Sequence, residues 1–247
     1  MIDIEKLEKL MEIIKNSSSI VFFGGAGVST ASNIPDFRGS NGIYKYSPEE
    51  IISHSFFINN TKEFYEFYFE KLVYKDALPN ECHKFLKKLE DDNKIDAIIT
   101  QNIDNLHQKA GSSKVIELHG SIFRNYCMKC KQFYDLNDNI FKNCGYKNVP
   151  VCECGGIVKP DVVLYEENLN ERDIIDAINY ISNCDTLIIG GTSLVVYPAA
   201  SFVRYFKGKN LVVINLGDKL KVNGVDLYIN GKIEDYLNTL NYEKYLK

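Results

Sequence analysis

Short apolar runs recur along the chain and predict the strands of one buried sheet. Most of these runs are continuous and rich in β-branched residues, with little alternation between apolar and polar positions. This pattern is typical of parallel strands whose two faces are both covered by helices. We therefore predict strands at residues 20–23, 95–99, 115–118, 186–189, 211–215 and 227–229.

Between the predicted strands, apolar residues recur at helical spacing. Ile4, Leu7, Leu10, Met11 and Ile14, for example, form one stripe near the amino terminus. Strands that alternate with helices are typical of an α/β fold, so we predict a Rossmann-like parallel sheet with helices on both faces. The predicted helices cover residues 4–15, 62–72, 81–91, 173–181 and 197–206.

Two segments interrupt this alternation. Residues 41–75 are rich in Phe and Tyr and are predicted to be helical, whereas residues 122–159 contain five of the seven cysteines. The chain has no internal repeat and no low-complexity linker that would separate independent domains. We therefore interpret both segments as insertions in a single domain that spans residues 1–247.

Polar residues follow two successive predicted strands. Asn102 and Asp104 come shortly after strand 95–99, and His119 comes directly after strand 115–118. In an open parallel sheet, residues just past the carboxyl ends of the strands lie where ligands bind. Amide, carboxylate and imidazole groups gathered there can orient a polar ligand and transfer a proton. A single polar loop could simply cap a helix, but two such loops favour an active site.

A glycine-rich turn at residues 24–30 follows the first predicted strand and precedes a predicted helix start. This arrangement lets backbone N–H groups approach a pyrophosphate. The dinucleotide fingerprint is incomplete, because Thr30 occupies the position of its third glycine. In addition, no acidic residue ends a second strand about 20 residues further on, where a dehydrogenase would hold the ribose. These departures disfavour a hydride-transferring enzyme.

The cysteine spacing predicts a metal site. Cys127 and Cys130 form a C-x-x-C pair, and Cys152 and Cys154 form a C-x-C pair 21 residues later. Four thiolates can close a tetrahedral zinc site, which leaves no open position for a catalytic water. Disulfides are the alternative, and a reducing compartment disfavours them. We predict one structural Zn²⁺ per chain on these four residues. Because the C-x-C pair is unusually tight, Cys144 remains an alternative to one of its members.

Composition and charge argue against several classes of protein. The chain has 247 residues, of which 45% are hydrophobic and 25% are charged, as is ordinary for soluble globular proteins. Its formal net charge of −4 argues against a nucleic-acid partner. Interleaved Glu and Lys residues in the first helix exclude a signal-peptide core, and no apolar run approaches the roughly 20 residues of a membrane span. We expect a cytoplasmic protein with neither a nucleic-acid nor a membrane partner.

Taken together, seven blocks of residues resemble the motifs of the sirtuin family in its bacterial form, in the same order and along nearly the whole chain. The resemblance implies an NAD-dependent protein-lysine deacylase that consumes NAD as a co-substrate. Its products would be the free lysine, nicotinamide and O-acyl-ADP-ribose. The insertions at 41–75 and 122–159 would be the helical module and the zinc-binding module of this family. The matching blocks are residues 24–29, 34–39, 100–104, 117–120, 160–167, 191–194 and 212–217.

The resemblance also implies roles for individual residues. His119 would act as the general base that helps to deprotonate a ribose hydroxyl, while Asn102 and Asp104 would orient the ribose, a water molecule and the nicotinamide carboxamide. Phe37 and Arg38 would close over the cofactor. The other implied NAD contacts are Gly25, Ala26, Gly27, Ser29, Thr30, Asp36, Gln101, Ile103, Gly191, Thr192, Ser193, Asn215 and Leu216.

Acyl-lysine peptides or proteins are the implied substrates, held as an extended strand between two segments that contain Val163, Tyr165 and Val195. Residues 165–167 read Tyr-Glu-Glu where Phe-Gly-Glu is commoner in the family, so Glu166 replaces a conformationally free glycine.

The implied acyl group is neutral. Sirtuins that prefer succinyl-lysine carry a Tyr-x-x-Arg pair, whereas this chain has Tyr65 and Tyr68 at the aligned positions. Lys71 is the alternative cation for an acidic acyl group.

Three other functions remain open on sequence alone. A mono-ADP-ribosyltransferase or an NAD hydrolase would share the NAD contacts and differ in the acceptor. A non-catalytic NAD-sensing interaction module would bind the same ligand, but it would not require both Asn102 and His119.

Overall fold

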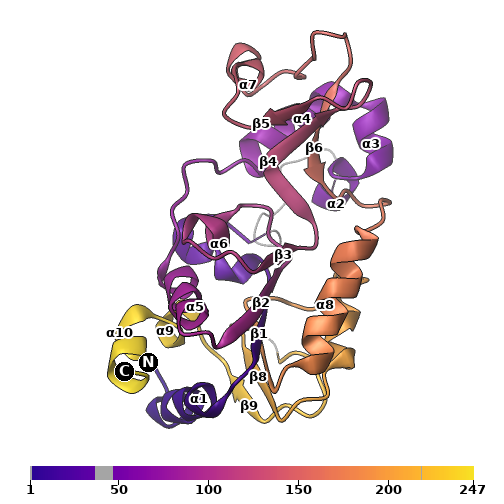
Figure 1. The fold of residues 1–247 in the computed structure, drawn as a ribbon. Helices are drawn as coiled ribbons and strands as arrows, with labels where there is room; N and C mark the ends of the chain where they lie inside the picture. Colours follow the sequence, from indigo (N-terminus) through magenta and orange to yellow (C-terminus); the bar gives the residue numbers. More distant parts are fainter. Residues whose placement is uncertain (1, 37–46, 218) are drawn as a thin grey trace.

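The computed structural model describes residues 2–36, 47–217 and 219–247 (Figure 1). Its main feature is a six-stranded sheet in the order β3-β2-β1-β7-β8-β9, in which every neighbouring pair is parallel. All six strands were predicted from the apolar runs, with ends that differ by one residue at most. The strands are β1 (Ile20–Gly24), β2 (Ile95–Thr100), β3 (Val115–Glu117), β7 (Thr186–Gly190), β8 (Asn210–Ile214) and β9 (Leu227–Ile229).

Helices cover both faces of this sheet, which explains why its strands are continuously apolar. Along β1, Phe22 packs into the apolar cluster on one face, whereas Val21 and Phe23 pack into the cluster on the other. The helices on the first face are α1 (Ile4–Asn16), α5 (Glu81–Asp91), α9 (Ile233–Tyr236) and α10 (Thr239–Tyr245). Helix α8 (Glu171–Asn183) covers the opposite face (Figure 1).

The two insertions form one lobe at the end of the sheet that carries β3 (Figure 1). The helical insertion contains α2 (Pro48–Ile51), α3 (His54–Asn59) and α4 (Thr61–Lys71). The cysteine-rich insertion contains the antiparallel strands β4 (Gly120–Cys127), β5 (Phe133–Asp135) and β6 (Val158–Val162), together with α7 (Asn139–Asn143). Both contribute to a single apolar cluster, so neither builds a core alone. We propose that this lobe is an elaboration of one domain.

Two helix predictions were wrong. The segment predicted as a helix at 197–206 is the 3-10 helix η3 (Ala199–Tyr205), with Pro198 as its N-cap and Phe206 as its C-cap. The helix start predicted after the glycine-rich turn is a pair of short 3-10 helices, η1 (Ala26–Val28) and η2 (Thr30–Ser32). Here Gly27 N donates to Gly191 O at 2.8 Å, so a loop distant in sequence shapes the turn.

None of the helices in the described ranges has the length and apolar character that a bilayer span requires.

Candidate active site and metal centre

A cavity of about 660 Å³ lies at the carboxyl ends of β1, β2, β7 and β8. These ends meet at one edge because the strands are parallel, and that edge is where open α/β sheets bind ligands. Phe37 and Arg38 lie outside the described residues. All other predicted NAD contacts except His119 line the cavity: Gly25, Ala26, Gly27, Ser29, Thr30, Asp36, Gln101, Asn102, Ile103, Asp104, Gly191, Thr192, Ser193, Asn215 and Leu216.

One wall of the cavity contains a hydrogen-bonded chain of three predicted site residues. Asn102 Nδ2 donates to Ser29 Oγ at 3.0 Å, and Ser29 Oγ donates to Asp104 Oδ2 at 2.6 Å. The other carboxylate oxygen of Asp104 accepts from the backbone N–H of Leu106 at 2.9 Å, at the start of α6 (Leu106–Lys109). Asp104 therefore both supports this helix and anchors Ser29. Burial raises the pKa of Asp104, and the two donors oppose that rise.

His119 is held by a backbone contact beside this wall. Its Nδ1 lies 2.9 Å from the carbonyl oxygen of Gln101, which can only accept, so Nδ1 carries a proton and Nε2 has the free lone pair. Burial lowers the pKa of His119 and favours the neutral ring. His119 itself does not line the cavity, whereas Gln101 does. This tautomer is the one required of a general base that acts through Nε2.

The turn after His119 is fixed by close packing and an ion-pair network. Gly120 has a φ of +76°, and a Cβ there would lie 1.8 Å from Asp161 O, so only glycine fits. Arg124 binds Glu117 at 2.5 Å and Asp161 at 2.8 Å, which ties β3, β4 and β6 together around this turn. Arg124 could not be identified from the sequence, because its two partners lie 7 and 37 residues away.

Close packing against a second loop requires the glycines of the turn after β1. A Cβ on Gly25 would lie 2.8 Å from Thr192 Cβ, and one on Gly27 would lie 2.8 Å from Gly191 Cα. Gln101 Nε2 donates to Thr192 Oγ1 at 3.0 Å. The loops after β1, β2 and β7 therefore pack directly against one another and form a preorganised edge of the cavity.

The predicted peptide-binding residues occupy different environments. Val163 lines the cavity, whereas Tyr165 and Val195 do not and are 41% and 54% exposed. Glu166 keeps a left-handed backbone (φ +75°) although it is not glycine. Its carboxylate accepts from Ser55 N at 2.8 Å and from Ser55 Oγ at 3.0 Å, which ties the loop to the first turn of α3.

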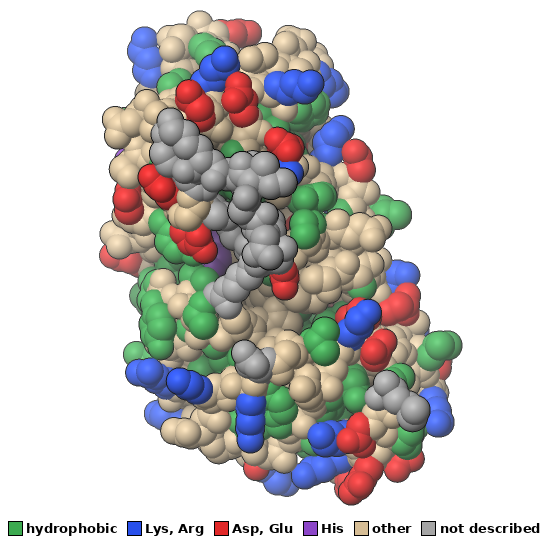
Figure 2. All heavy atoms as spheres, turned by 180° about the vertical axis from the view of Figure 1, so that it is seen from behind, with side chains coloured by type: hydrophobic (Ala, Val, Ile, Leu, Met, Phe, Trp, Pro, Cys, Tyr) green, Lys and Arg blue, Asp and Glu red, His purple; other side chains and the backbone are tan. Residues whose placement is uncertain are grey.

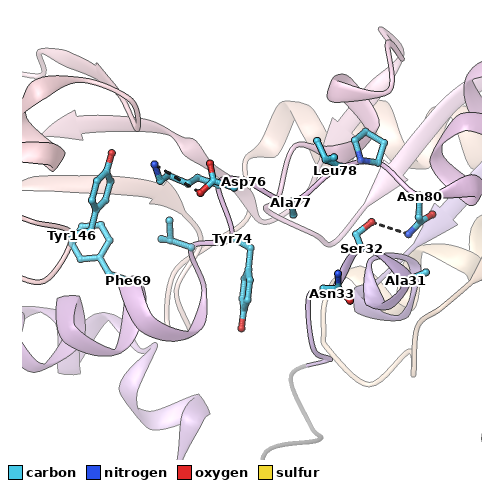
Figure 3. A pocket seen from close by; sticks show the side chains of 13 residues that line it. Ala31, Ser32, Asn33, Phe69, Tyr74, Asp76, Ala77, Leu78, Asn80 and Tyr146 are labelled. Carbon is cyan, nitrogen blue, oxygen red and sulfur yellow. Dashed lines mark hydrogen bonds and ion pairs between the residues drawn. The ribbon is translucent and has the colours of Figure 1, made fainter.

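A second cavity of about 700 Å³ adjoins the first, and Ala31 and Tyr74 line both. Figure 3 shows Tyr74 between the aromatic pair Phe69 and Tyr146 and the turn that carries Asn33. None of the predicted site residues lines this second cavity. We therefore place the candidate active site in the first cavity.

Four cysteine sulfurs of the inserted lobe converge on one point, as predicted. The Sγ atoms of Cys127, Cys130, Cys152 and Cys154 all lie within 4.8 Å of one another. The closest pairs, Cys127–Cys154 and Cys130–Cys152, are 3.4 and 3.6 Å apart, and all seven cysteines are free. Tetrahedral Zn²⁺ with Zn–S bonds of 2.3 Å requires S···S distances of about 3.8 Å. The donor set therefore fits a structural zinc ion.

Cys144 is not part of this cluster. Its Sγ contacts the carbonyl oxygen of Phe141 at 3.2 Å, at the end of α7. The tight C-x-C pair is accommodated by Gly156, where a Cβ would lie 2.6 Å from Cys127 Sγ. The structure thus selects Cys152 and Cys154 over Cys144 as the second pair.

Two buried histidines, His83 on α5 and His107 on α6, have ring centroids 4.7 Å apart. Within the described residues, His83 Nε2 and both ring nitrogens of His107 have no hydrogen-bond partner. Burial lowers the pKa of His83 to about 4 and holds the pKa of His107 well below its usual value. Both rings are therefore neutral in the folded protein at neutral pH.

We expect acidification to destabilise the protein through this histidine pair. Between pH 6.5 and about 4 the unfolded chain binds protons at both rings and the folded chain does not, so the free energy of unfolding falls as pH falls. His83 alone accounts for about 3 kcal/mol over this range. Urea unfolding of wild type and His107→Leu from pH 7.5 to 4.5 measures the slope of the free energy of unfolding against pH. His107→Leu should flatten it; an equal slope in the two proteins would contradict the expectation.

Comparisons with known proteins point to one family. Residues 25–198 match the Sir2 family. An NAD-dependent protein deacetylase from Clostridium acetobutylicum is 54% identical over 247 residues, covering 97% of this chain and 100% of that protein. A solved complex of Sir2 with p53 peptide and NAD⁺ superimposes with a TM-score of 0.85 at 36% identity, covering 96% of this chain and 98% of the other. A Sir2 structure with deacetylated p53 peptide and 3′-O-acetyl-ADP-ribose has a TM-score of 0.86 at 38% identity, covering 96% and 97%. A cavity of this construction, a four-cysteine cluster and similarity along nearly the whole chain lead to one conclusion: the protein belongs to the Sir2 family.

Proposed function

We propose that the protein is an NAD-dependent protein-lysine deacetylase that releases free lysine, nicotinamide and O-acyl-ADP-ribose. The observation that carries this proposal is the neutral His119, anchored through Nδ1 to the Gln101 carbonyl, beside the Asn102–Ser29–Asp104 chain. The names of the Clostridium relative and of the Sir2 product complex support it. In this reaction NAD supplies the ribose that accepts the acyl group, with nicotinamide as the leaving group.

Each group of residues in the site would have a different role in the reaction. In the turn at residues 25–30, the backbone N–H groups of Ala26 and Thr30 would face the pyrophosphate. The other four N–H groups already donate to backbone carbonyls. Asn102 offers both a donor and an acceptor to the ribose and the carboxamide, and Ile103 supplies an apolar wall. His119 would accept a ribose hydroxyl proton at Nε2. Thr192, Ser193 and Asn215 line the cavity at the ends of β7 and β8, where they would contact the adenosine half.

A zinc ion would be held by Cys127, Cys130, Cys152 and Cys154, where it would supply a cross-link for the lobe and no catalytic chemistry. Seven free cysteines and a four-thiolate site are suited to a reducing compartment, which supports action in the cytoplasm. Figure 2 shows Lys and Arg side chains interspersed with Asp and Glu among the described residues of that face, without one basic patch. Protein and peptide substrates suit such a surface better than nucleic acid does.

One assay tests the proposal and separates it from its rivals. The purified protein is incubated with an acetyl-lysine peptide and NAD, and nicotinamide, deacetylated peptide and O-acetyl-ADP-ribose are measured separately. A deacetylase produces all three in equal amounts. Nicotinamide and free ADP-ribose without deacetylated peptide would indicate an NAD hydrolase, and ADP-ribose attached to protein would indicate a transferase. If NAD were not consumed at all, the protein would be a non-catalytic NAD-binding module instead.

We expect succinyl-lysine to be a poor substrate. Lys71 lines the cavity and its Nζ lies 2.7 Å from Glu70. A lysine would offer an acyl carboxylate only a point charge, without the planar, two-pronged contact of an arginine. The kcat/KM for a succinyl peptide should be about 10²-fold below that for the matched acetyl peptide. In Lys71→Gln this ratio should not change. A succinyl preference in the wild type, lost in Lys71→Gln, would show instead that Lys71 binds the carboxylate.

A further inference from the structure

Arg124 binds two carboxylates that lie on either side of His119. Its Nη1 donates to Glu117 Oε2 at 2.5 Å, and its Nε donates to Asp161 Oδ2 at 2.8 Å. Glu117 ends β3, two residues before His119, whereas Asp161 lies on β6, and its carbonyl oxygen packs against Gly120, the residue after His119. One guanidinium group therefore joins the segment that enters this turn to the strand that packs against the segment leaving it.

The strand that leads to His119 is attached to the sheet on one side only. β3 has three residues and lies at the edge of the six-stranded sheet, where it pairs with β2. An edge strand has a single row of ladder hydrogen bonds. The ion pair between Glu117 and Arg124 gives the end of β3 a second attachment, this one to the inserted lobe.

His119 depends on the backbone of these segments for its position. Among the described residues, its side chain is hydrogen-bonded to the Gln101 carbonyl alone, and its own carbonyl oxygen accepts from Val163 N at 3.0 Å. Val163 lines the cavity and comes two residues after Asp161 in the chain. A shift of β3 relative to β6 would therefore move the imidazole relative to the cavity.

β4 is irregular at the position of Arg124. Its pairing with β6 loses the regular register between Ser121 and Asn125, as at a β-bulge. Bulges re-aim side chains and occur often beside active sites. In the same stretch Ile122 N donates to the Ile103 carbonyl at 3.0 Å. The irregular part of β4 therefore connects the lobe to the loop after β2 as well as to the end of β3.

The two ion pairs of Arg124 differ in burial. The side chain of Glu117 is 7% exposed and that of Asp161 is 44% exposed. Water screens an exposed pair, so the pair with Asp161 contributes little. Burial raises the pKa of Glu117, and Arg124 opposes that rise. Removal of Arg124 would leave a buried carboxylate without its cation, which a protein relieves by local rearrangement or by uptake of a proton.

We propose that Arg124 is a positioning residue of the deacetylation reaction, whose ion pair with Glu117 holds His119 where its Nε2 can accept the ribose hydroxyl proton. The inference rests on the deacylase function proposed above. Arg124 does not line the cavity, so it would act through His119 without touching NAD or the peptide. A displacement of about 1 Å at a catalytic group can lower a rate by about 10²-fold, so an ion pair outside the cavity is sufficient.

Arg124→Met tests this, because it removes the charge and keeps an unbranched apolar stem. Release of deacetylated peptide and exchange of labelled nicotinamide into NAD are measured on one preparation at saturating acetyl peptide and NAD. Deacetylation should fall by about 10- to 10²-fold, whereas exchange, which precedes the proton transfer at His119, should stay within about twofold of the wild type. General loosening of the lobe would lower both activities, because lobe residues line the cavity.

Four further variants separate the two ion pairs and supply a control. Arg124→Lys keeps a cation that can reach one carboxylate and should recover most of the lost deacetylation. Glu117→Gln should reproduce the selective loss, whereas Asp161→Asn should stay within about twofold of the wild type, because its ion pair is exposed. Arg172→Met is the matched control, since Arg172 is 90% exposed on α8 and pairs with Asp176; it should change neither activity.

Zinc content and thermal unfolding show whether each variant is folded. If Arg124→Met does not fold, Glu117→Gln and Arg124→Lys allow the same comparison of the two activities. The inference is overturned if deacetylation and exchange fall in parallel, which would mean that Arg124 only stabilises the lobe, or if neither activity falls. Failure of the wild type to deacetylate an acetyl peptide would instead refute the proposed function.

Discussion

Replacement of His119 by alanine is expected to lower the rate of peptide deacetylation by 10²- to 10⁴-fold, the range over which a positioned general base contributes. The fold should survive, because among the described residues the His119 side chain is hydrogen-bonded to the Gln101 carbonyl alone. The substitution removes the imidazole ring, and with it the lone pair at Nε2. It does not disturb Ser29 or Asp104. Steady-state release of deacetylated peptide measures the effect.

Two controls show which step of the reaction is lost in His119→Ala. His119 would act on a ribose hydroxyl after nicotinamide has left, so His119→Ala should retain exchange of labelled nicotinamide into NAD. Asn102→Ala should lose both exchange and deacetylation, because Asn102 would orient the ribose before the bond breaks. Both variants should contain the wild-type amount of zinc. Near-wild-type deacetylation by His119→Ala would contradict the mechanism.

Loss of a cysteine ligand should have the largest effect on the structure itself. Cys127→Ser and Cys152→Ser are expected to reduce bound zinc from one ion per chain to a small fraction and to unfold the lobe built from the two insertions. Structural zinc contributes roughly 10–16 kcal/mol of apparent binding energy in small metal-dependent folds. Cys127 and Cys152 also belong to the shared apolar cluster, so the damage should reach α4 and the cavity wall.

Cys144→Ser is the matched control for these variants. Cys144 lies in the same insertion, but its sulfur contacts Phe141 O rather than the cluster, so zinc content and melting temperature should stay close to those of the wild type. Metal analysis of dialysed protein and thermal unfolding provide the two measurements. Zinc loss in Cys144→Ser with retention in Cys152→Ser would reverse the assignment of ligands.

The sheet could be predicted from the sequence because its signal is local. Each strand is a short apolar run, and burial on both faces of a parallel sheet requires such a run wherever it lies in the chain. The positions of Asn102, Asp104 and His119 followed from the same logic, since residues after parallel strands gather at one edge. The C-x-x-C pair was likewise recognisable from spacing alone.

The partners of these residues could not be predicted in the same way. Ser29 joins Asn102 to Asp104 across 73 and 75 residues, and no local pattern encodes such a pairing. The choice between Cys144 and the C-x-C pair depended on which sulfurs the strands β4 and β6 bring together.

Tyr65 and Tyr68 on α4 show most directly what the sequence determines and what only the tertiary structure decides. Their spacing along the helix is a property of the sequence, and it predicts that both lie on one face. Which hydroxyl meets Val158 O, and which is left without a partner among the described residues, depends on where β6 packs against that face. The sequence by itself determined the strands, most of the helices and the chemical groups at the sheet edge, because hydrophobic periodicity acts over a few residues. Only the tertiary structure decided which of those groups are paired, because hydrogen bonds and metal ligation act between atoms a few ångströms apart, however distant they are in the chain.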